Sequence, residues 1–183
     1  MSGLHAYLAQ KAEALAGFTA RVLAPGYAPP RITATVTAEG RSGVRRIRIR
    51  DFQILSDSPP DFAGYDLGPS SPEIQLGVLG SCLTHSFLIQ AARLGVPIDS
   101  LEVEVTGRID ARGGKPGHAD IPVYPHAIAY SVHIASAAPV FELENLHQAV
   151  ERTCPILNLL RAPQAIEGRL VPIQTGAYVE VAA

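Results

Sequence analysis

The sequence predicts an α+β fold in which long helices pack on antiparallel sheet. Three observations support this prediction. Helical and strand-like segments follow one another in the order helix, strands, long helix, strands, helix, strand. The strand-like segments alternate apolar and polar residues, as half-buried antiparallel strands do. The longest apolar segment, residues 77–96, carries almost no charge and predicts a buried central helix.

The composition suits one domain of 183 residues with a large core, because 47% of the residues are hydrophobic and 17% are charged. A net charge of -2 gives no reason to expect nucleic acid or an anionic membrane as a partner. The N-terminus lacks the pattern of a signal peptide, and Ser, Thr, His and Gln interrupt the apolar segment. We therefore expect a cytoplasmic protein that does not enter a membrane.

The first part of the chain predicts one helix, then strands, then a long loop. Apolar residues at helical intervals predict a surface helix over residues 4–23. Alternating β-branched residues from residue 31 onward predict a strand that reaches Ala38, and a tight turn is expected over 39–43. Residues 44–55 form the next predicted strand, with isoleucines on one side and arginines on the other. Proline and glycine make residues 56–72 a loop, and loops of this length are often functional.

The central helix has a clear predicted start and end. Ser70 and Glu73 match a capping box, Pro72 suits a first turn, and the helix ends near Leu94. The later expected elements are a strand over 101–110, a loop over 111–122, a strand over 127–136, a helix over 141–153, a short helix over 156–161 and a strand in the latter part of 165–183. We expect residues 1–30 to be a helical extension and residues 31–183 a single domain.

The two cysteines are the chemically notable residues. Chemistry at sulfur needs the thiolate, and burial in apolar surroundings raises the pKa of a thiol. Cys82 in the central helix is therefore either an inert packing residue or a nucleophile activated by a nearby cation. The candidate cations are Arg41 and the row Arg46, Arg48 and Arg50. A solvated strand face is the alternative explanation of that row.

Cys154 precedes a proline, which cannot make the backbone hydrogen bond of a continuing helix. If the helix restarts at Pro155, Cys154 is its N-cap, where free N–H groups favour a thiolate. The alternative is that Cys154 is a small apolar packing residue.

Two segments together carry a resemblance to a known family. Residues 69–95, PSSPEIQLGVLGSCLTHSFLIQAARLG, and residues 150–161, VERTCPILNLLR, are similar to the two cysteine motifs of osmotically inducible protein C and the organic hydroperoxide resistance proteins. The similarity covers roughly residues 31–180. It implies an α+β fold in which two chains interlock as a homodimer, with two active sites at the interface. It also implies reduction of organic hydroperoxides.

The resemblance assigns roles to particular residues. Cys82 falls on the attacking cysteine and Cys154 on the resolving one. Arg41 is the best match to the family's arginine, with Arg46 and Arg48 as alternatives. Glu73 is the counterpart of the family's glutamate, although the asparagine of the family's Asn-Pro-Glu motif is absent.

The spacing of Glu73 also departs from the family pattern. Glu73 precedes Cys82 by nine residues, one fewer than in typical hydroperoxide resistance members. Nine residues of regular helix turn through about 900°, which puts the two side chains on opposite faces. This departure indicates a peripheral branch of the family.

The predicted activity is a thiol-dependent peroxidase. Its intermediates are a Cys82 sulfenic acid and a Cys82–Cys154 disulfide, which an external dithiol reduces. Lipoylated proteins are the reductant in the hydroperoxide resistance branch. No cofactor or metal is expected.

Two alternatives remain open. Cys82 and His85 form a C-x-x-H pair that Cys154 or His147 would have to complete as a metal site, which falls short of a closed zinc site. His85 is otherwise a candidate for the mouth of the substrate site. The second alternative is a non-enzymatic binding protein for apolar small molecules, against which the presence of both cysteines argues.

Overall fold

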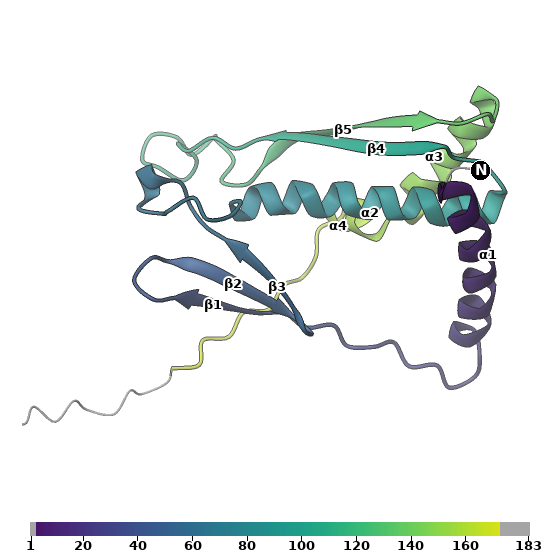
Figure 1. Ribbon diagram of the computed structural model, residues 1–183. Helices are drawn as coiled ribbons and strands as arrows, with labels where there is room; N and C mark the ends of the chain where they lie inside the picture. The colour runs from purple at the N-terminus through teal and green to yellow at the C-terminus, as the bar shows by residue number, and fades with distance from the viewer. Residues whose placement is uncertain (1–2, 173–183) are drawn as a thin grey trace, which may run out of the picture.

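The computed structural model describes residues 3–172 and contains the α+β fold that the sequence predicts (Figure 1). Its elements, in chain order, are α1 (Gly3–Val22), β1 (Thr35–Glu39), β2 (Val44–Ile49), β3 (Phe52–Ser56), a 3-10 turn η1 (Pro60–Phe62), α2 (Ser71–Leu94), β4 (Ser100–Arg108), β5 (His126–Ala135), α3 (Val140–Thr153) and α4 (Pro155–Arg161).

Helix α2 is the central element, and its ends match the sequence prediction. The Glu73 carboxylate accepts hydrogen bonds from the backbone N–H and the hydroxyl of Ser70, which closes the start of the helix. Gly95 ends it with a left-handed φ of 71°, and its N–H donates to the carbonyl of Ala91. The helix is long and apolar enough to cross a bilayer by length and composition alone, a test that core helices also pass.

The core lies between α2, the β4–β5 hairpin and α3. Residues 101, 103 and 105 of β4 are the less exposed members of the strand, as the alternating pattern predicts, and their side chains pack on the core around α2. Gly80 permits the close approach of β4, because an added Cβ would lie 3.2 Å from Val105 Cγ2. Leu146 and Val150 of α3 complete the buried cluster with Leu83 and Phe87.

A second, separate sheet consists of β1, β2 and β3, all antiparallel. The single strand expected over residues 44–55 is wrong, because a turn at Arg50 and Asp51 divides it into β2 and β3. Arg50 takes a left-handed φ of 54° there. The turn contains neither Gly nor Asn, the residues that most often adopt this conformation, so the sequence did not indicate it. The fold therefore has two small sheets, and Figure 1 shows them on opposite sides of α2.

The three-stranded sheet leaves an apolar face uncovered. Its register places Val36, Ile47 and Ile54 side by side, with Phe52 and Ile49 as the next pair on the same face. Val36 is 56% exposed and Phe52 63% exposed in the single chain. This face is available for burial against another surface.

Helix α1 lies across the C-terminal end of α2 (Figure 1). Leu8 is buried in the core, and Leu4 packs against it. The second half of α1 carries mostly exposed residues. At the other end of the chain, the strand expected in the latter part of residues 165–183 falls largely outside the described residues.

Candidate active site

The two cysteines meet in space although 72 positions separate them in sequence. The Sγ atoms of Cys82 and Cys154 are 3.5 Å apart, which is contact distance for two thiols. Cys154 is completely buried, whereas Cys82 is partly exposed. A small-molecule reactant therefore reaches Cys82 first.

The break between α3 and α4 positions Cys154 as the sequence predicts. Helix α4 starts at Pro155, and Cys154 is its N-cap with an extended backbone. The Cys154 N–H still donates to the carbonyl of Val150 at 2.8 Å, as the last bond of α3. Asn158 holds the next turn by donating from Nδ2 to the Cys154 carbonyl at 2.8 Å. The sulfur is thereby fixed between two helices, directed at α2.

Burial raises the pKa of the Cys82 thiol, and the neighbouring Cys154 adds to this effect. Two donors oppose it: the backbone N–H of Ile156, at the start of α4, and the hydroxyl of Ser86. No arginine of residues 3–172 is among the groups with the largest effects on this pKa. The single chain therefore keeps Cys82 protonated at neutral pH, and a nucleophilic role needs a cation from elsewhere.

A cavity of about 280 Å³ opens beside Cys82. Residues from α1, from α2 and from the break before α4 line it, namely Leu15, Phe18, Cys82, His85, Ser86, Ile89, Gln90, Arg93, Thr153 and Pro155. Most of its wall surface is apolar, and its volume suits a small organic molecule next to a thiol.

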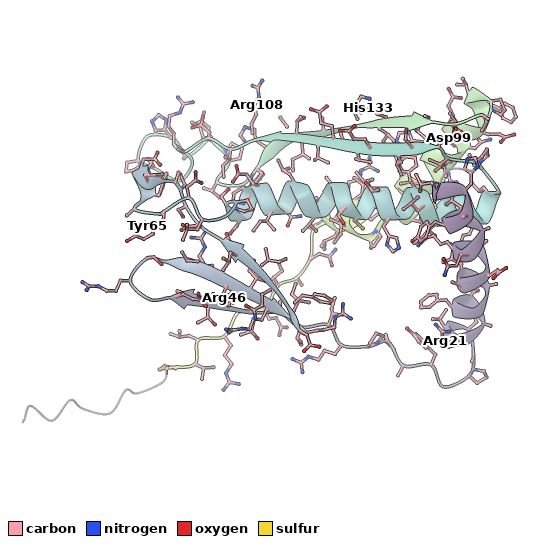
Figure 2. The ribbon with its side chains drawn as sticks, viewed as in Figure 1. Arg21, Arg46, Tyr65, Asp99, Arg108 and His133 are labelled. Carbon is pink, nitrogen blue, oxygen red and sulfur yellow. The ribbon has the colours of Figure 1, made fainter. Side chains whose placement is uncertain are left out.

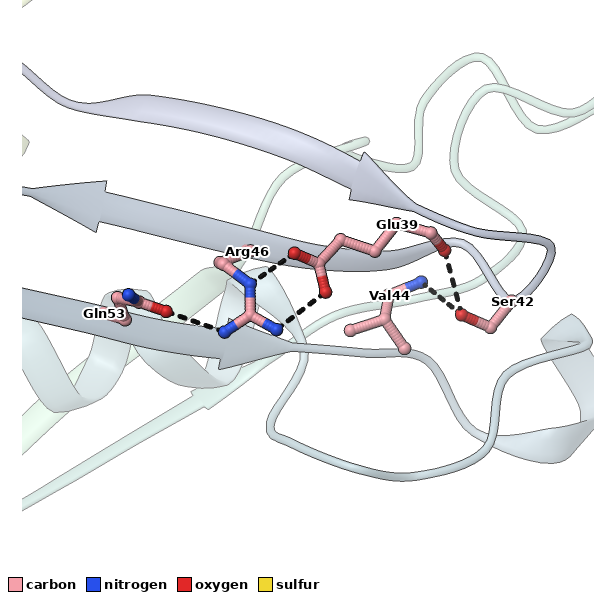
Figure 3. A network of polar contacts seen from close by, with 5 residues as sticks. All are labelled: Glu39, Ser42, Val44, Arg46 and Gln53. Atoms are coloured by element: carbon pink, nitrogen blue, oxygen red, sulfur yellow. Dashed lines mark hydrogen bonds and ion pairs between the residues drawn. The ribbon is translucent and has the colours of Figure 1, made fainter.

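The four candidate arginines, Arg41, Arg46, Arg48 and Arg50, all lie on strands or turns of the separate β1–β2–β3 sheet and do not line this cavity. Figure 3 shows Arg46 held by its own sheet: its guanidinium pairs with the Glu39 carboxylate through Nε and Nη2, and Nη1 donates to Gln53 Oε1 at 2.7 Å. This pair lowers the pKa of Glu39. Arg41 in the β1–β2 turn and Arg48 on β2 are exposed. In Figure 2, Arg46 lies on the sheet, well apart from Arg21 on α1.

Glu73 is engaged at the start of α2. Its Oε2 accepts from the backbone N–H of Ser70 at 2.7 Å and from the Ser70 hydroxyl at 2.6 Å, and these bonds lower the pKa of Glu73. Because α2 is continuous, nine residues put Glu73 about 14 Å along the axis from Cys82. Within one chain the structure does not bring Glu73 to the thiols.

His85 does lie at the site, one turn after Cys82 on the cavity wall. Its Nε2 is 3.1 Å from Nζ of Lys11, which connects α1 to α2. Burial, and then the charge of Lys11, lowers the pKa of His85. The imidazole is therefore neutral at pH 7, and its Nε2 accepts the hydrogen bond from the Lys11 ammonium.

Other cavity residues were absent from the sequence prediction. Ser86 and Arg93 follow Cys82 at helical intervals, so that the spacing along α2 was a usable signal for them. Leu15 and Phe18 had no such signal, because nothing local in α1 indicates which helix it covers.

His147 belongs to a polar network behind Cys154. Its Nε2 is 2.8 Å from the Tyr130 hydroxyl, which also donates to Glu151 at 3.0 Å. Arg161 donates to the same Glu151 oxygen at 2.7 Å. Burial, with Glu151 adding to it, raises the pKa of Tyr130 to about 12. Among residues 3–172 no three His, Cys, Asp or Glu side chains form a group that could hold a metal ion.

The sequence and the fold each match known proteins. The family model described as OsmC-like protein matches residues 64–168. No protein among curated sequences matches the chain.

Among solved structures, an OsmC-like protein from Mycoplasma pneumoniae superposes with a TM-score of 0.62 at 19% identity, over 73% of this chain and 89% of that one. An organic hydroperoxide resistance protein from Legionella pneumophila superposes with a TM-score of 0.54 at 14% identity, over 74% and 92% of the two chains. At these identities the structures establish the fold alone.

Proposed function

The chain belongs to the OsmC-like protein family, and from that premise we propose that it is a thiol-dependent peroxidase that reduces organic hydroperoxides to alcohols. The solved relative from Legionella pneumophila is named an organic hydroperoxide resistance protein, which supports this activity for the fold. The proposed site consists of Cys82 and Cys154, with an arginine and Glu73 assisting.

One observation carries the proposal: the two sulfurs lie 3.5 Å apart beside a cavity that can hold an organic molecule. A disulfide requires the sulfurs to approach to about 2.05 Å. Movement of about 1.5 Å is within the reach of side-chain rotation and a small shift of α4. Packing alone would not require two thiols in contact, because Ala or Val fills such positions.

The proposed reaction has three steps. The Cys82 thiolate attacks the distal oxygen of ROOH, the O–O bond breaks, and the alkoxide takes a proton to leave as ROH. Cys82 is now a sulfenic acid. The Cys154 sulfur attacks it, a disulfide forms, and water leaves. An external dithiol, a lipoylated protein being the proposed one, then reduces the disulfide and is itself oxidised.

The first step needs a cation, because burial raises the pKa of Cys82. We assign this cation to an arginine of a second copy of the chain in a homodimer. Arg41, exposed in its turn, is the first candidate, and Arg46 and Arg48 are the alternatives. The exposed apolar face of the same sheet supports Arg41 in particular, since burial of that face against a second copy would bring the β1–β2 turn to that copy. Glu73 of the same second copy has the role of orienting that arginine, since Glu73 lies about 14 Å along α2 from the Cys82 of its own chain.

Mass spectrometry after one equivalent of cumene hydroperoxide tests the proposal. The wild-type chain should lose two hydrogens as the disulfide forms. Cys154→Ser should gain one oxygen, at Cys82, and Cys82→Ser should remain unchanged. Stopped-flow oxidation no faster than that of free cysteine would contradict the peroxidase.

A binding protein for apolar small molecules is the second candidate, and the raised pKa of Cys82 in the single chain is the observation that favours it. In that case both cysteine variants would bind an apolar ligand as tightly as the wild type, and no disulfide would form with peroxide.

A further inference from the structure

We propose that α1 forms part of the substrate site, and that Leu15 and Phe18 give the protein its preference for hydroperoxides with a bulky apolar group over hydrogen peroxide. This inference rests on the proposed peroxidase function and adds to it the residues that select the substrate. Helix α1 lies outside residues 64–168, the part of the chain that the family model matches.

The residues of α1 that face α2 form a single stripe along the helix. Leu8, Lys11, Leu15 and Phe18 follow one another at intervals of three, four and three residues, which places them on one side of the helix. Leu8 is buried in the core, and Lys11 contacts His85 at 3.1 Å. These two contacts fix the direction of α1.

The next two residues of the stripe, Leu15 and Phe18, then reach the cavity in front of Cys82. They form its wall on the α1 side, and Ile89 is among the residues that line it from α2.

Phe18 has apolar surface left for a ligand to cover. Phe18 is 48% exposed. The Arg21 guanidinium lies 5.6 Å from the ring centroid, and this contact restricts the ring. A substrate in the cavity would cover part of the remaining ring surface.

The selection has a simple physical basis. An aryl or alkyl group gains free energy when apolar walls replace its water, whereas hydrogen peroxide has no apolar surface to bury. Removal of the α1 wall should therefore slow the organic substrate alone. Each methylene-sized contact in an apolar pocket typically changes specificity by about 10-fold or more.

The variant Leu15→Ala/Phe18→Ala tests the inference in single-turnover oxidation of Cys82 by cumene hydroperoxide and by hydrogen peroxide. We expect the ratio of the cumene hydroperoxide rate to the hydrogen peroxide rate to fall about 10-fold, because only the rate with cumene hydroperoxide should fall. Tyr27→Ala is the matched control, because Tyr27 is also 48% exposed but does not line the cavity. An unchanged ratio, or an equal fall of both rates, would overturn the proposal.

A second readout separates this inference from the peroxidase itself. Alkylation of Cys82 by N-phenylmaleimide and by N-methylmaleimide, located by peptide mass spectrometry, needs no peroxide chemistry. The wild type should prefer the phenyl reagent, and the double variant should lose that preference. If neither peroxide reacts faster than with free cysteine, the peroxidase proposal fails, and the maleimide ratio still decides the role of α1: equal preference in wild type and variant overturns it.

Discussion

At the scale of single residues, the chemistry depends on how a partly buried thiol becomes a thiolate. Within one chain, the N–H of Ile156 and the hydroxyl of Ser86 are the donors that favour the charged form of Cys82, and burial outweighs them. Cys154 cannot supply the missing charge, because its own ionisation would repel that of Cys82. A guanidinium within about 4–6 Å lowers such a pKa by about one to three units.

The pH dependence of Cys82 alkylation by iodoacetamide measures this effect. The rate should rise with pH, since only the thiolate reacts, and its midpoint in the wild type should lie near neutrality. In the single chain, burial raises the pKa of this thiol above its ordinary value. Replacement of the activating arginine in Arg41→Ala, Arg46→Ala or Arg48→Ala should move the midpoint up by about one to three units.

Arg112→Ala is the control for that experiment, because Asp110 holds Arg112 at 2.6 Å in the loop between β4 and β5. If all three sheet variants keep the wild-type midpoint, none of Arg41, Arg46 and Arg48 activates Cys82.

At the scale of elements, the start of α2 combines a structural and a proposed catalytic role in Glu73. The capping box explains why this carboxylate lies beside Ser70. One oxygen of Glu73 accepts both bonds, and the second oxygen is available for an arginine. Two substitutions separate these roles.

Ser70→Ala removes the cap and leaves the charge, whereas Glu73→Gln keeps an acceptor for the cap and removes the charge. Ser70→Ala should lower the free energy of unfolding by about 1 kcal/mol, measured by urea denaturation, with an unchanged rate of Cys82 oxidation. Glu73→Gln should slow that oxidation at nearly unchanged stability. Ser71→Ala, one residue further along, is the control for the cap. An unchanged rate in Glu73→Gln would leave Glu73 a structural residue only.

At the scale of the whole molecule, the β1–β2–β3 sheet has an apolar face that the single chain leaves uncovered. One face of this sheet is an apolar strip that water contacts, and the turn and strand that carry the arginine candidates belong to the same sheet. The body of the protein, around α2, has its own core without it. A homodimer that buries the strip would stabilise the sheet and complete the site in one step.

Phe52→Asp tests this assembly by analytical ultracentrifugation. Phe52 is 63% exposed in the single chain, so that the substitution should leave the protomer folded. A charge buried without a partner costs about 3 kcal/mol, which corresponds to a rise of about 100-fold in the dimer Kd. Cys82 oxidation should slow in parallel. Gln53→Asp, on the opposite face of β3, should leave the dimer intact. A dimer as tight in Phe52→Asp as in the wild type would place the interface elsewhere.

The sequence alone determined the features whose causes lie within a few neighbouring residues. The capping box of Ser70 and Glu73, the end of α2 at Gly95 and the restart of the helix at Pro155 are all local, and the structure confirms each. The α+β class follows from the same local periodicities. The turn at Arg50 escaped prediction because Arg50, which takes the left-handed φ, is not a residue type that usually does so, and Asp51 alone is a weak turn signal.

Only the tertiary structure decided which distant surfaces meet. The 3.5 Å contact of Cys82 with Cys154 and the cover of their cavity by α1 depend on the packing of three helices around α2. An amphipathic stripe such as that of α1 fixes the face that a helix buries, but the partner of that face is chosen by the free energy of the whole core. The activating arginine remains a prediction for the same reason, since its position depends on a surface that a single chain leaves uncovered.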